Sequence, residues 1–405
     1  MRVSPLAVPD AEAKIPCLAI IRAVPAGTST GEIRTRPMKN ISLAFTGDLC
    51  PGLRLRDVMS QKGVEYPFRH VQQRLASADI AIANLEGFVL DGVDLNTRAR
   101  RMGVPTELAL GLRNSGIDAF CVANNHLMDS GEAGFDSTLS FLEEHALGYF
   151  GAGADADAAQ HPLTIETQAG VVAFLGYCDF SPHWASARRP GVAGLQPERV
   201  LRQVKNVAAK GYTVVVSLHA DLEFSRHPAP WRVQLSRRLV DAGARLVIQH
   251  HPHVIQGVET YGNGLIAYSL GNFVFSVLDN QYQRRWPGTD EGLILRVDLD
   301  ADNDQKPPRW AVEPLRINDE HCPEPLEGDE ARSVMERFYR QCAELGDPHA
   351  LRRHWLQRSR REARSRLTDA YWHLRRGQPA RSWSELLAPF ARSENRRWVR
   401  GVIGF

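Results

Sequence analysis

The chain has 405 residues, which is enough for one large domain with an appendage or for two domains. Its hydrophobic fraction of 43% is ordinary for a globular protein, and its net charge of +2 argues against a strongly charged partner for the chain as a whole. The six cysteines form no C-x-x-C pair, which excludes a thiolate zinc site and a disulfide framework, and no stretch approaches the roughly 20 apolar residues of a membrane-spanning helix.

The N-terminal region shows no regular pattern before the first expected strand, which begins just after Met38. We therefore predict a loosely ordered extension over residues 1–37. An apolar run over residues 15–24 is interrupted by a proline and an arginine, and it follows acidic residues where a signal peptide carries positive charge. The sequence thus predicts no secretion signal and a cytoplasmic location.

Apolar strands alternate with helices from residue 40 onward. Apolar residues at helical spacing predict helices over residues 71–78, 106–115, 134–145, 197–210 and 231–242. Strand, helix and glycine in this order favour an α/β layered fold with mainly parallel pairing. The later strands follow one another without helices, which predicts an antiparallel second sheet or an edge meander over residues 264–268, 292–299 and 309–317.

Five of the expected strands end in residue types that bind metals. These strands cover residues 41–48, 79–86, 119–126, 213–219 and 247–254, and their ends supply Asp48, Glu86, Asn125, His219, His251 and His253. Because ligands bind in the crevice beyond the carboxyl ends of strands, we predict that these six side chains converge. A buried carboxylate such as Glu86 needs a cation or an arginine partner, whereas Asp48 alone is equally compatible with a turn.

The strand ends offer carboxylate, amide and imidazole donors but no thiolate. That set suits one or two Mn, Fe or Zn ions in a hydrolytic site better than a structural zinc. Two adjacent ions can hold a phosphoryl or carbonyl oxygen and activate a water. His126 is then the predicted general acid, and Asp129 either hydrogen-bonds His126 or caps the helix that begins near Gly131. Glu223 is expected to pair with His219, and the absence of G-x-S-x-G argues against a serine nucleophile.

The C-terminal region differs in composition from the rest of the chain. Residues 319–328 are rich in Pro, Glu and Gly and are predicted to be a linker, and from Gly328 onward 17 arginines against 9 acidic residues give a local charge of +8. Either a helical appendage packs its Trp and Leu face on the core and leaves its arginines solvated, or its basic helices contact a membrane surface or a protein.

We expect no nucleic-acid partner. We also expect no metal ligand from this tail, so that deletion after Gly328 leaves metal binding intact. The interleaved aromatic residues are Trp355, Tyr371, Trp372, Trp383, Phe390 and Trp398.

Six ordered motifs between about residues 40 and 300 resemble the CapA family, the capsule and poly-γ-glutamate synthesis group built on a calcineurin-like metallophosphoesterase fold. The resemblance implies a four-layer α/β sandwich, with two sheets flanked by helices, over residues 38–318. The linker and basic helices of residues 319–405 follow it as a C-terminal helical appendage. The motifs are Gly47-Asp48, Asn84-Leu85-Glu86, residues 123–131, His219 with Glu223, residues 251–259 and residues 269–273.

The resemblance also implies roles for individual residues. It implies that His126 is the general acid. The chain departs from the parent pattern at Cys50, where that pattern has an imidazole, so the first metal position is one ligand short. Residues expected near the substrate or behind the ligands are Asn84, Asn124, Glu223 and Asn272. The implied metal roles are Asp48 on the first ion, Glu86 as the bridge, Asn125 and His219 on the second ion, and His251 and His253 divided between the two.

In function, the resemblance implies a bacterial metal-dependent hydrolase linked to capsule or poly-γ-glutamate-type polymer synthesis, with an anionic polymer or a phosphoester as its substrate. Two alternatives remain open. A γ-glutamyl amide suits the same metal site, because a carbonyl oxygen can take the position of a phosphoryl oxygen. A fold that is retained without catalysis, as a scaffold in polymer assembly or export, also fits the motifs, because fold analogy does not fix function.

Overall fold

The computed structural model describes residues 40–376, apart from 98–99, 180, 182, 279–280, 301–302 and 304. The extension predicted over residues 1–37 and the aromatic residues Trp383, Phe390 and Trp398 lie outside the described residues. Within the described part, strands and helices alternate, and the predicted α/β class is confirmed. None of the helices described is long and apolar enough to cross a membrane.

The first large sheet has eight strands and carries the ends of the first three predicted strands. Four strands pair in parallel, namely β1 (Asn40–Leu49), β2 (Ile80–Leu85), β5 (Ala119–Cys121) and β6 (Gly148–Phe150). On the other side of β1, three strands pair antiparallel, namely β16 (Glu291–Asp300), β17 (Arg309–Ile317) and β18 (Pro323–Pro325). The order is β18-β17-β16-β1-β2-β5-β6, and β15 (Asn272–Val274) pairs with the end of β1.

The second large sheet has six strands in the order β13-β14-β12-β11-β9-β8. Its interior strands run parallel, and the two edge strands, β8 and β13, run antiparallel to their neighbours. Two small sheets pair β3 with β4 and β7 with β10. The bounds are β3 (Phe88–Val89), β4 (Gly103–Val104), β7 (Ala152–Gly153), β8 (Leu163–Thr167), β9 (Gly170–Cys178), β10 (Gly191–Val192), β11 (Thr213–His219), β12 (Ala244–His250), β13 (Val258–Tyr261) and β14 (Gly264–Ala267).

The helices begin and end close to the predicted positions. The helix predicted over residues 106–115 is instead a short α-helix, α3, that continues as a 3₁₀ helix. The α-helices are α1 (Leu55–Lys62), α2 (Gln72–Ala76), α3 (Thr106–Ala109), α4 (Gly131–Glu144), α5 (Pro197–Ala208), α6 (Pro230–Asp241), α7 (Gln281–Arg284), α8 (Gly328–Glu344) and α9 (Pro348–Arg375). The 3₁₀ helices are Tyr66–Phe68, Leu110–Asn114 and Ala158–Gln160.

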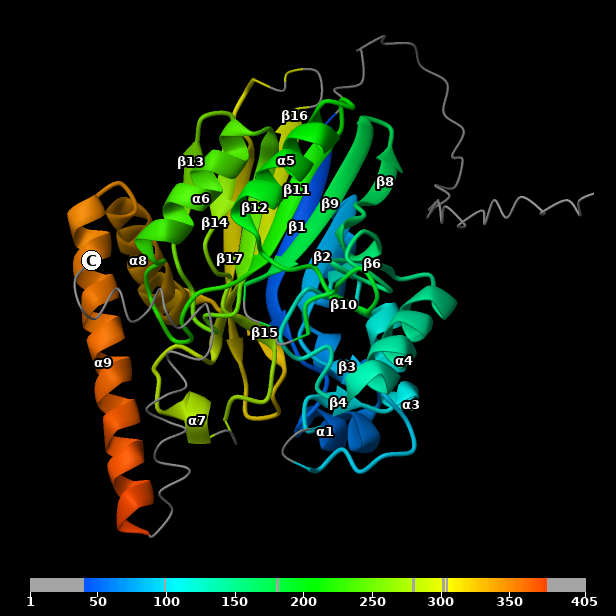
Figure 1. Cartoon of the computed structure of the whole chain (residues 1–405), viewed down its shortest axis with the longest axis vertical. Coiled ribbons are helices and arrows are strands. Elements are labelled where there is room, and N and C mark those ends of the chain that lie inside the picture. The colour runs from blue at the N-terminus through cyan, green and yellow to red at the C-terminus, as the bar shows by residue number, and fades with distance from the viewer. Residues whose placement is uncertain are drawn as a thin grey trace, which may run out of the picture.

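The two large sheets share a hydrophobic core between them, and helices α5 and α6 cover the outer face of the second sheet (Figure 1). Strand β9 shows both faces at once. Phe174 joins the core between the sheets, whereas its neighbours Ala173 and Leu175 join the core beneath α5 and α6. Successive strand residues point to opposite faces, so a strand covered on both sides is apolar throughout. This explains why the strands read as continuous apolar runs.

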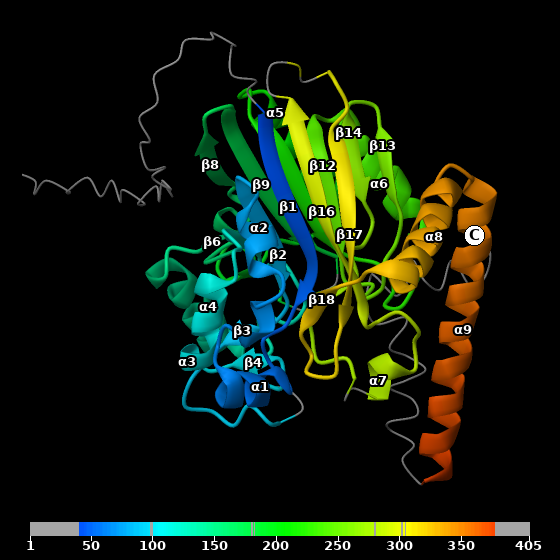
Figure 2. The ribbon, with the colours of Figure 1, turned by 180° about the vertical axis from the view of Figure 1, so that it is seen from behind.

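The three later strands divide between the two large sheets. The strand predicted over residues 264–268 is β14, which lies in the second sheet parallel to β12, whereas the other two form the predicted edge meander. Strand β16 pairs with β1 over the register Asn40↔Asp300 to Phe45↔Leu295, so β16, β17 and β18 extend the first sheet as an antiparallel meander (Figure 2). The linker prediction is wrong for Pro323–Pro325, because this segment is the edge strand β18. Proline lacks a backbone donor, and an edge strand tolerates it.

The basic tail is attached more firmly than the appendage prediction implied. Helix α8 buries Val334 and Phe338 in the core, so deletion after Gly328 would expose that core as well as remove the tail. Helix α9 buries Ala350 and Leu351 near its start. The prediction that the Trp and Leu face packs is wrong for the end of α9, where, within the described residues, the exposed large side chains are Leu367, Tyr371, Trp372 and Leu374.

Candidate metal centre

The predicted ligands meet where the parallel strands of both sheets end. Strands β1 and β2 align Asp48 with Asn84, and strands β11 and β12 align His219 with His250. Because the two sheets face each other across a shared core, their carboxyl ends open into one region, at the lower end of the strands in Figure 1. The structure brings together all six residues that the sequence predicts as ligands.

Glycine at position 47 allows the backbone of β1 to approach the chain at Gly271. A β-carbon on Gly47 would lie 1.9 Å from the carbonyl oxygen of Gly271, so no other residue fits without a shift of the backbone. The amide of Asp48 donates to the same carbonyl oxygen at 3.0 Å. The register of β1 against β2 shifts between Phe45 and Asp48 at this point. This local irregularity fixes the position of the Asp48 side chain.

Asp48 is fully buried among hydrogen-bond donors. Its Oδ1 accepts from Asn84 Nδ2 at 2.8 Å, and its Oδ2 accepts from the backbone amide of His251 at 3.2 Å. His253 Nδ1 lies 3.3 Å from Oδ2. Burial opposes ionisation, but the neighbouring imidazoles of His250 and His253 hold the pKa of Asp48 below its usual range. Asp48 is therefore available as an ionised ligand.

Glu86 is a buried carboxylate without hydrogen bonds. Its side chain is 0% exposed, and within the described residues neither of its oxygens accepts a hydrogen bond. Its Oε1 lies 3.7 Å from His126 Nε2 and 3.7 Å from His253 Nε2. Burial and then the charge of Asp48 raise the pKa of Glu86 well above its usual value. An unpaired charge in this position costs several kcal/mol, which a bound cation would remove.

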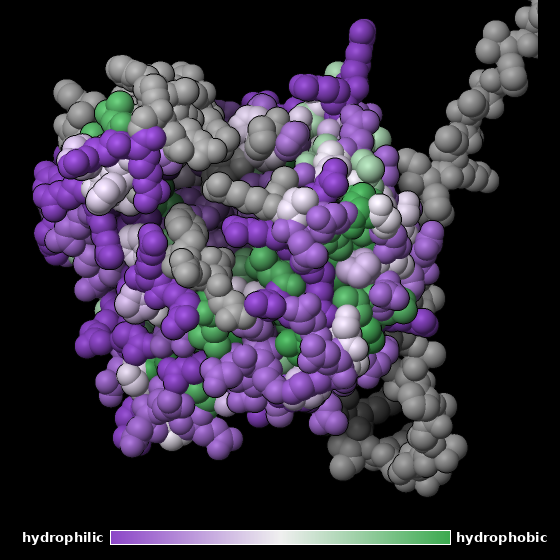
Figure 3. Space-filling view, turned by 90° about the horizontal axis from the view of Figure 1, so that it is seen from below, coloured by the Kyte–Doolittle hydropathy of each residue, from purple (hydrophilic) through white to green (hydrophobic). Residues whose placement is uncertain are grey.

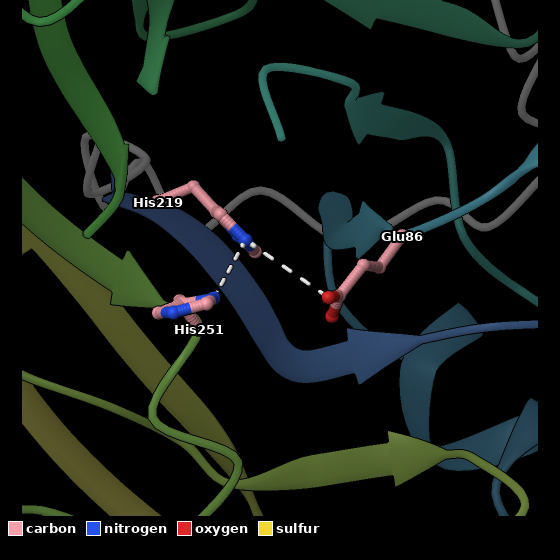
Figure 4. Close-up of side chains that lie close together, drawn as sticks. All are labelled: Glu86, His219 and His251. Carbon is pink, nitrogen blue, oxygen red and sulfur yellow. Dashed lines mark hydrogen bonds and ion pairs between the residues drawn. The ribbon is translucent and has the colours of Figure 1, made fainter. Parts of the chain in front are cut away.

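His219 and His251 form the other side of the centre, opposite Glu86 (Figure 4). His219 Nε2 lies 2.8 Å from Asn125 Oδ1 and 3.2 Å from His251 Nδ1. Burial lowers the pKa of both imidazoles, and the nearby imidazole of His251 lowers that of His219 further, whereas His253 acts on His251. Both rings are thus held neutral, the state in which imidazole binds metals.

Two groups of possible ligands share Glu86. One consists of Asp48, Glu86 and His253, and the other of Glu86, His219 and His251. In each group the donor atoms lie within 4.8 Å of one another. A carboxylate common to two neighbouring ligand sets is the arrangement that a pair of divalent ions requires, and the donors are carboxylate and imidazole. The residues therefore fit one or two divalent metal ions.

His126 lies beside the centre and is partly open to solvent. Its Nδ1 is 2.8 Å from Asp129 Oδ2, and its side chain is 27% exposed. Ser130, not Asp129, occupies the N-cap of α4, and the cap has no side-chain hydrogen bond. Of the two alternatives for Asp129, the structure therefore has the hydrogen bond to His126. That contact fixes the ring so that Nε2 faces Glu86 at 3.7 Å.

The predicted asparagines lie behind the ligands rather than in front of them. Asn124 Oδ1 accepts from the amides of His126 and Leu127, which shapes the turn after β5. Asn272 Oδ1 lies 2.9 Å from His253 Nδ1 and orients that ring. Asn84 and Asn272 are 0% exposed and Asn124 is 1% exposed, so these amides position ligands.

Glu223 approaches two histidines that we did not assign to it. It forms a possible ligand group with His251 and His253. This approach arises in the turn that follows β11, where Phe224 has a φ of +58° and its amide donates to Pro252 O at 2.7 Å. This turn directs Glu223 toward the histidines that follow β12.

The site contains features that sequence reasoning missed. His250 Nδ1 lies 3.5 Å from Asp48 Oδ1, although we assigned no role to this residue. The feature of the sequence that could have identified His250 is its position directly before His251. His251 and His253 have φ values of +94° and +55°, a conformation that costs energy and collects at functional sites. Cys50 belongs to none of the possible ligand groups among the described residues, and its thiol donates to Met102 O at 3.8 Å instead.

A buried arginine supports the strand that leads to these histidines. Arg232 on α6 is 1% exposed, donates to Asp221 Oδ2 at 2.8 Å and donates through Nε to Gln249 Oε1 at 2.6 Å. Arg232→Ala is expected to lower the free energy of unfolding by about 3–5 kcal/mol, because it leaves Asp221 buried and unpaired. Urea denaturation of the variant measures this loss.

The matched control for this prediction is Arg238→Ala. Arg238 lies on the same helix, its side chain is 51% exposed, and it pairs with Glu198 at 2.7 Å. An exposed ion pair contributes at most about 1 kcal/mol, so the control should unfold nearly as the parent does. Equal stability losses for the two variants would show that the buried network contributes little.

Two kinds of comparison relate the chain to known proteins. A family model described as bacterial capsule synthesis protein PGA_cap matches residues 42–277. The chain is 29% identical over 304 residues to the capsule biosynthesis protein CapA of Bacillus anthracis, covering 73% of this chain and 71% of the relative. It is 29% identical over 305 residues to the PGA biosynthesis protein CapA of Bacillus subtilis (strain 168), covering 74% and 77%.

A solved structure is also similar, at a lower level. The crystal structure of a hypothetical protein from Thermus thermophilus shares 16% sequence identity and covers 68% of this chain and 98% of its own. The TM-score is 0.41, which is too low to support a conclusion about the fold.

Proposed function

The chain belongs to the bacterial capsule synthesis protein family, and from that membership we propose a metal-dependent hydrolase that acts in the synthesis of a capsule or poly-glutamate polymer. The observation that carries the proposal is Glu86, a buried carboxylate that accepts no hydrogen bond within the described residues. It is shared by two sets of ligand atoms. A purely structural site would have no reason to retain such a group unpaired.

The proposal assigns each ligand a position. Asp48 and His253 would hold one ion, His219 and His251 with Asn125 Oδ1 would hold the other, and Glu86 would contact both. Divalent ions bound there would polarise the scissile group and activate a water. Cys50 leaves the first position one ligand short of the parent pattern, and His250, 3.5 Å from Asp48, lies close to that position.

His126 supplies the proton in the proposed reaction. Asp129 accepts from Nδ1, and Nε2, which lies 3.1 Å from Asn125 Nδ2, would carry the proton that a leaving group needs once the ring is protonated and the substrate takes the place of that contact. The ring is 27% exposed, whereas the ligand imidazoles His219 and His253 are buried, so it lies on the side that a substrate can reach. Asp129 also stabilises the protonated ring before transfer.

Aromatic contacts connect two arginines of α9 to the centre, and an anionic substrate would be favoured by those that Glu362 does not neutralise; Glu362 pairs with Arg358 at 3.0 Å. The guanidinium groups of Arg358 and Arg361 lie 4.7 Å and 4.0 Å from the ring centroid of Trp286. Trp286 stacks on Phe224 at 5.3 Å, and Phe224 packs 6.1 Å from His253. This chain of contacts connects two arginines of α9 to a ligand of the centre.

In the view toward the strand ends, hydrophobic side chains gather within a hydrophilic rim (Figure 3).

We extend the proposal to the architecture. The two large sheets with their helices would be the four-layer sandwich of the calcineurin-like metallophosphoesterases, with α8 and α9 attached to it as a helical region. Supporting this, α5 and α6 cover the second sheet while α2 and α4 contact the first. Ligand atoms also come from the strand ends of both sheets, as two-metal chemistry at a sheet edge requires.

The test compares two substrates on the same protein. Chelated protein should show no turnover, and Mn²⁺, Fe²⁺ or Zn²⁺ should restore hydrolysis of a chromogenic phosphodiester by at least about 10³-fold. A γ-glutamyl amide should remain uncleaved under the same conditions. Cleavage of the amide alone would favour the γ-glutamyl alternative. Cleavage of neither, with metal bound, would favour a scaffold and contradict the proposal.

A further inference from the structure

A second cluster of possible ligands lies outside the strand-end centre. His227, Glu344 and His354 come from three separate segments, namely the loop after β11, the end of α8 and the second turn of α9. Their donor atoms lie within 4.8 Å of one another. None of these three residues belongs to the motifs that resemble the family, and no part of the proposed reaction uses them.

The geometry of the cluster converges on one oxygen. His227 Nε2 lies 2.6 Å and His354 Nε2 lies 3.1 Å from the same atom, Glu344 Oε2. The two imidazole rings stack face to face, with centroids 3.7 Å apart and planes 4° from parallel. Both imidazoles therefore present Nε2, an atom that can bind a metal, to the same carboxylate oxygen.

We propose that His227, Glu344 and His354 form a second metal site, suited to Zn²⁺, that fastens the C-terminal helices to the core. Two imidazoles and one carboxylate are a common zinc ligand set, and a water can complete the tetrahedron. The side chains are 15%, 41% and 33% exposed in that order, so an ion and its water can reach them. An imidazole binds a metal in the plane of its ring, so at least one of the two rings must turn out of the parallel stack to direct both Nε2 atoms at one ion.

The loop that the ion would hold also lines the strand-end centre. Arg358, one helical turn after His354, donates to the carbonyl oxygen of Glu223 at 2.8 Å. Glu223 and His227 lie in the same loop, so α9 contacts this loop at two points. An ion at the second site would therefore order the loop together with α8 and α9. The expectation that the tail contributes no ligand would then fail at the second site, whereas the ligand groups of the strand-end centre include none of the described residues after Gly328.

The experiment measures zinc in full-length protein by mass spectrometry after chelation and dialysis against Zn²⁺. To remove the strand-end centre, the background variant is His251→Ala with His253→Ala. This background should retain about one zinc per chain, and adding His354→Ala or Glu344→Gln should remove it. His349→Ala is the matched control, because His349 is an exposed residue of the same helix, and it should keep the zinc.

The zinc content of the His354→Ala variant distinguishes a second metal site from a hydrogen-bonded cluster. In the otherwise unaltered chain, His354→Ala should also lower the zinc content by about one equivalent and reduce the zinc-dependent rise in melting temperature to the part that the strand-end centre supplies. This comparison measures no activity and does not require the variant without strand-end histidines to fold. A negative result would therefore contradict the second site without contradicting the proposed function. Equal zinc in the His354→Ala variant and the unaltered chain would overturn the second site and leave a hydrogen-bonded cluster in its place.

Discussion

His251→Ala is expected to remove metal and activity together. His251 belongs to two of the possible ligand groups, and its Nδ1 lies 3.2 Å from His219 Nε2. The substitution deletes an imidazole donor and leaves the backbone strain at this position unchanged, since alanine tolerates a φ of +94° no better than histidine does. Hydrolysis should fall by at least about 10⁴-fold, because enzymes accelerate such reactions by about 10⁶-fold or more and the ions supply most of that.

The matched control is His161→Ala. His161 is exposed at the end of the 3₁₀ helix Ala158–Gln160, and its ring contacts only a local carbonyl among the contacts that the structure records for it. This variant should keep both metal and turnover. If His251→Ala lost activity while retaining every metal ion, the residue would act on the substrate and the assignment as a ligand would fail.

His126→Ala is expected to keep the metal and lose turnover. The ring lies beside the centre with Nδ1 on Asp129 and Nε2 3.7 Å from Glu86. Removing a general acid lowers turnover by about 10²–10⁴-fold. A substrate whose leaving group needs no proton, such as a nitrophenolate, should lose much less than a substrate with a poor alkoxide or amine leaving group.

The comparison of leaving groups distinguishes two roles for His126. A positioning role, through Asp129 or a bound water, would reduce turnover of good and poor leaving groups alike. Equal penalties for the two substrates would therefore contradict the general-acid assignment. Asp129→Asn provides a second measurement, because it keeps the hydrogen-bond geometry but removes the charge that stabilises the protonated ring. Its penalty should follow the same dependence on the leaving group, with a smaller magnitude.

Much of the centre could be predicted from the sequence, and the reason is geometric. Parallel strands bring their carboxyl ends to one edge, so Asp48, Glu86 and His219 could be grouped from strand patterns alone. Apolar runs marked the strands because both faces of the interior strands are covered, as Phe174 and Leu175 illustrate. The supporting role of the asparagines could be predicted because they lie near these ligands in the strand-end motifs.

Contacts that depend on turns could not be predicted. The approach of Glu223 to His251 depends on the positive φ of Phe224, which no local pattern encodes. His250 faces Asp48 because the register of β12 against β11 sets the direction of its side chain. A one-residue change of register would have turned it to the other face of the sheet.

The C-terminal region was the least predictable from composition. Pro323–Pro325 has the residues of a linker, yet it pairs with β17 at the edge of the sheet. Leu367 and Trp372 are residue types that usually pack against a core, yet their side chains are 59% and 54% exposed within the described chain. In both cases the partner surface, rather than the local sequence, decides whether an apolar or breaker residue is covered.

The metal content of the unaltered protein and of Glu86→Gln tests the central claim most directly. Glutamine keeps the shape of the side chain but removes the carboxylate charge that two ligand groups share. After chelation and saturation with Mn²⁺ or Zn²⁺, the unaltered protein should hold at least about one divalent ion more per chain than the variant. Any ion bound by His227, Glu344 and His354 is common to both proteins and cancels in the difference. Equal metal content in the two proteins would contradict a metal centre at the strand ends.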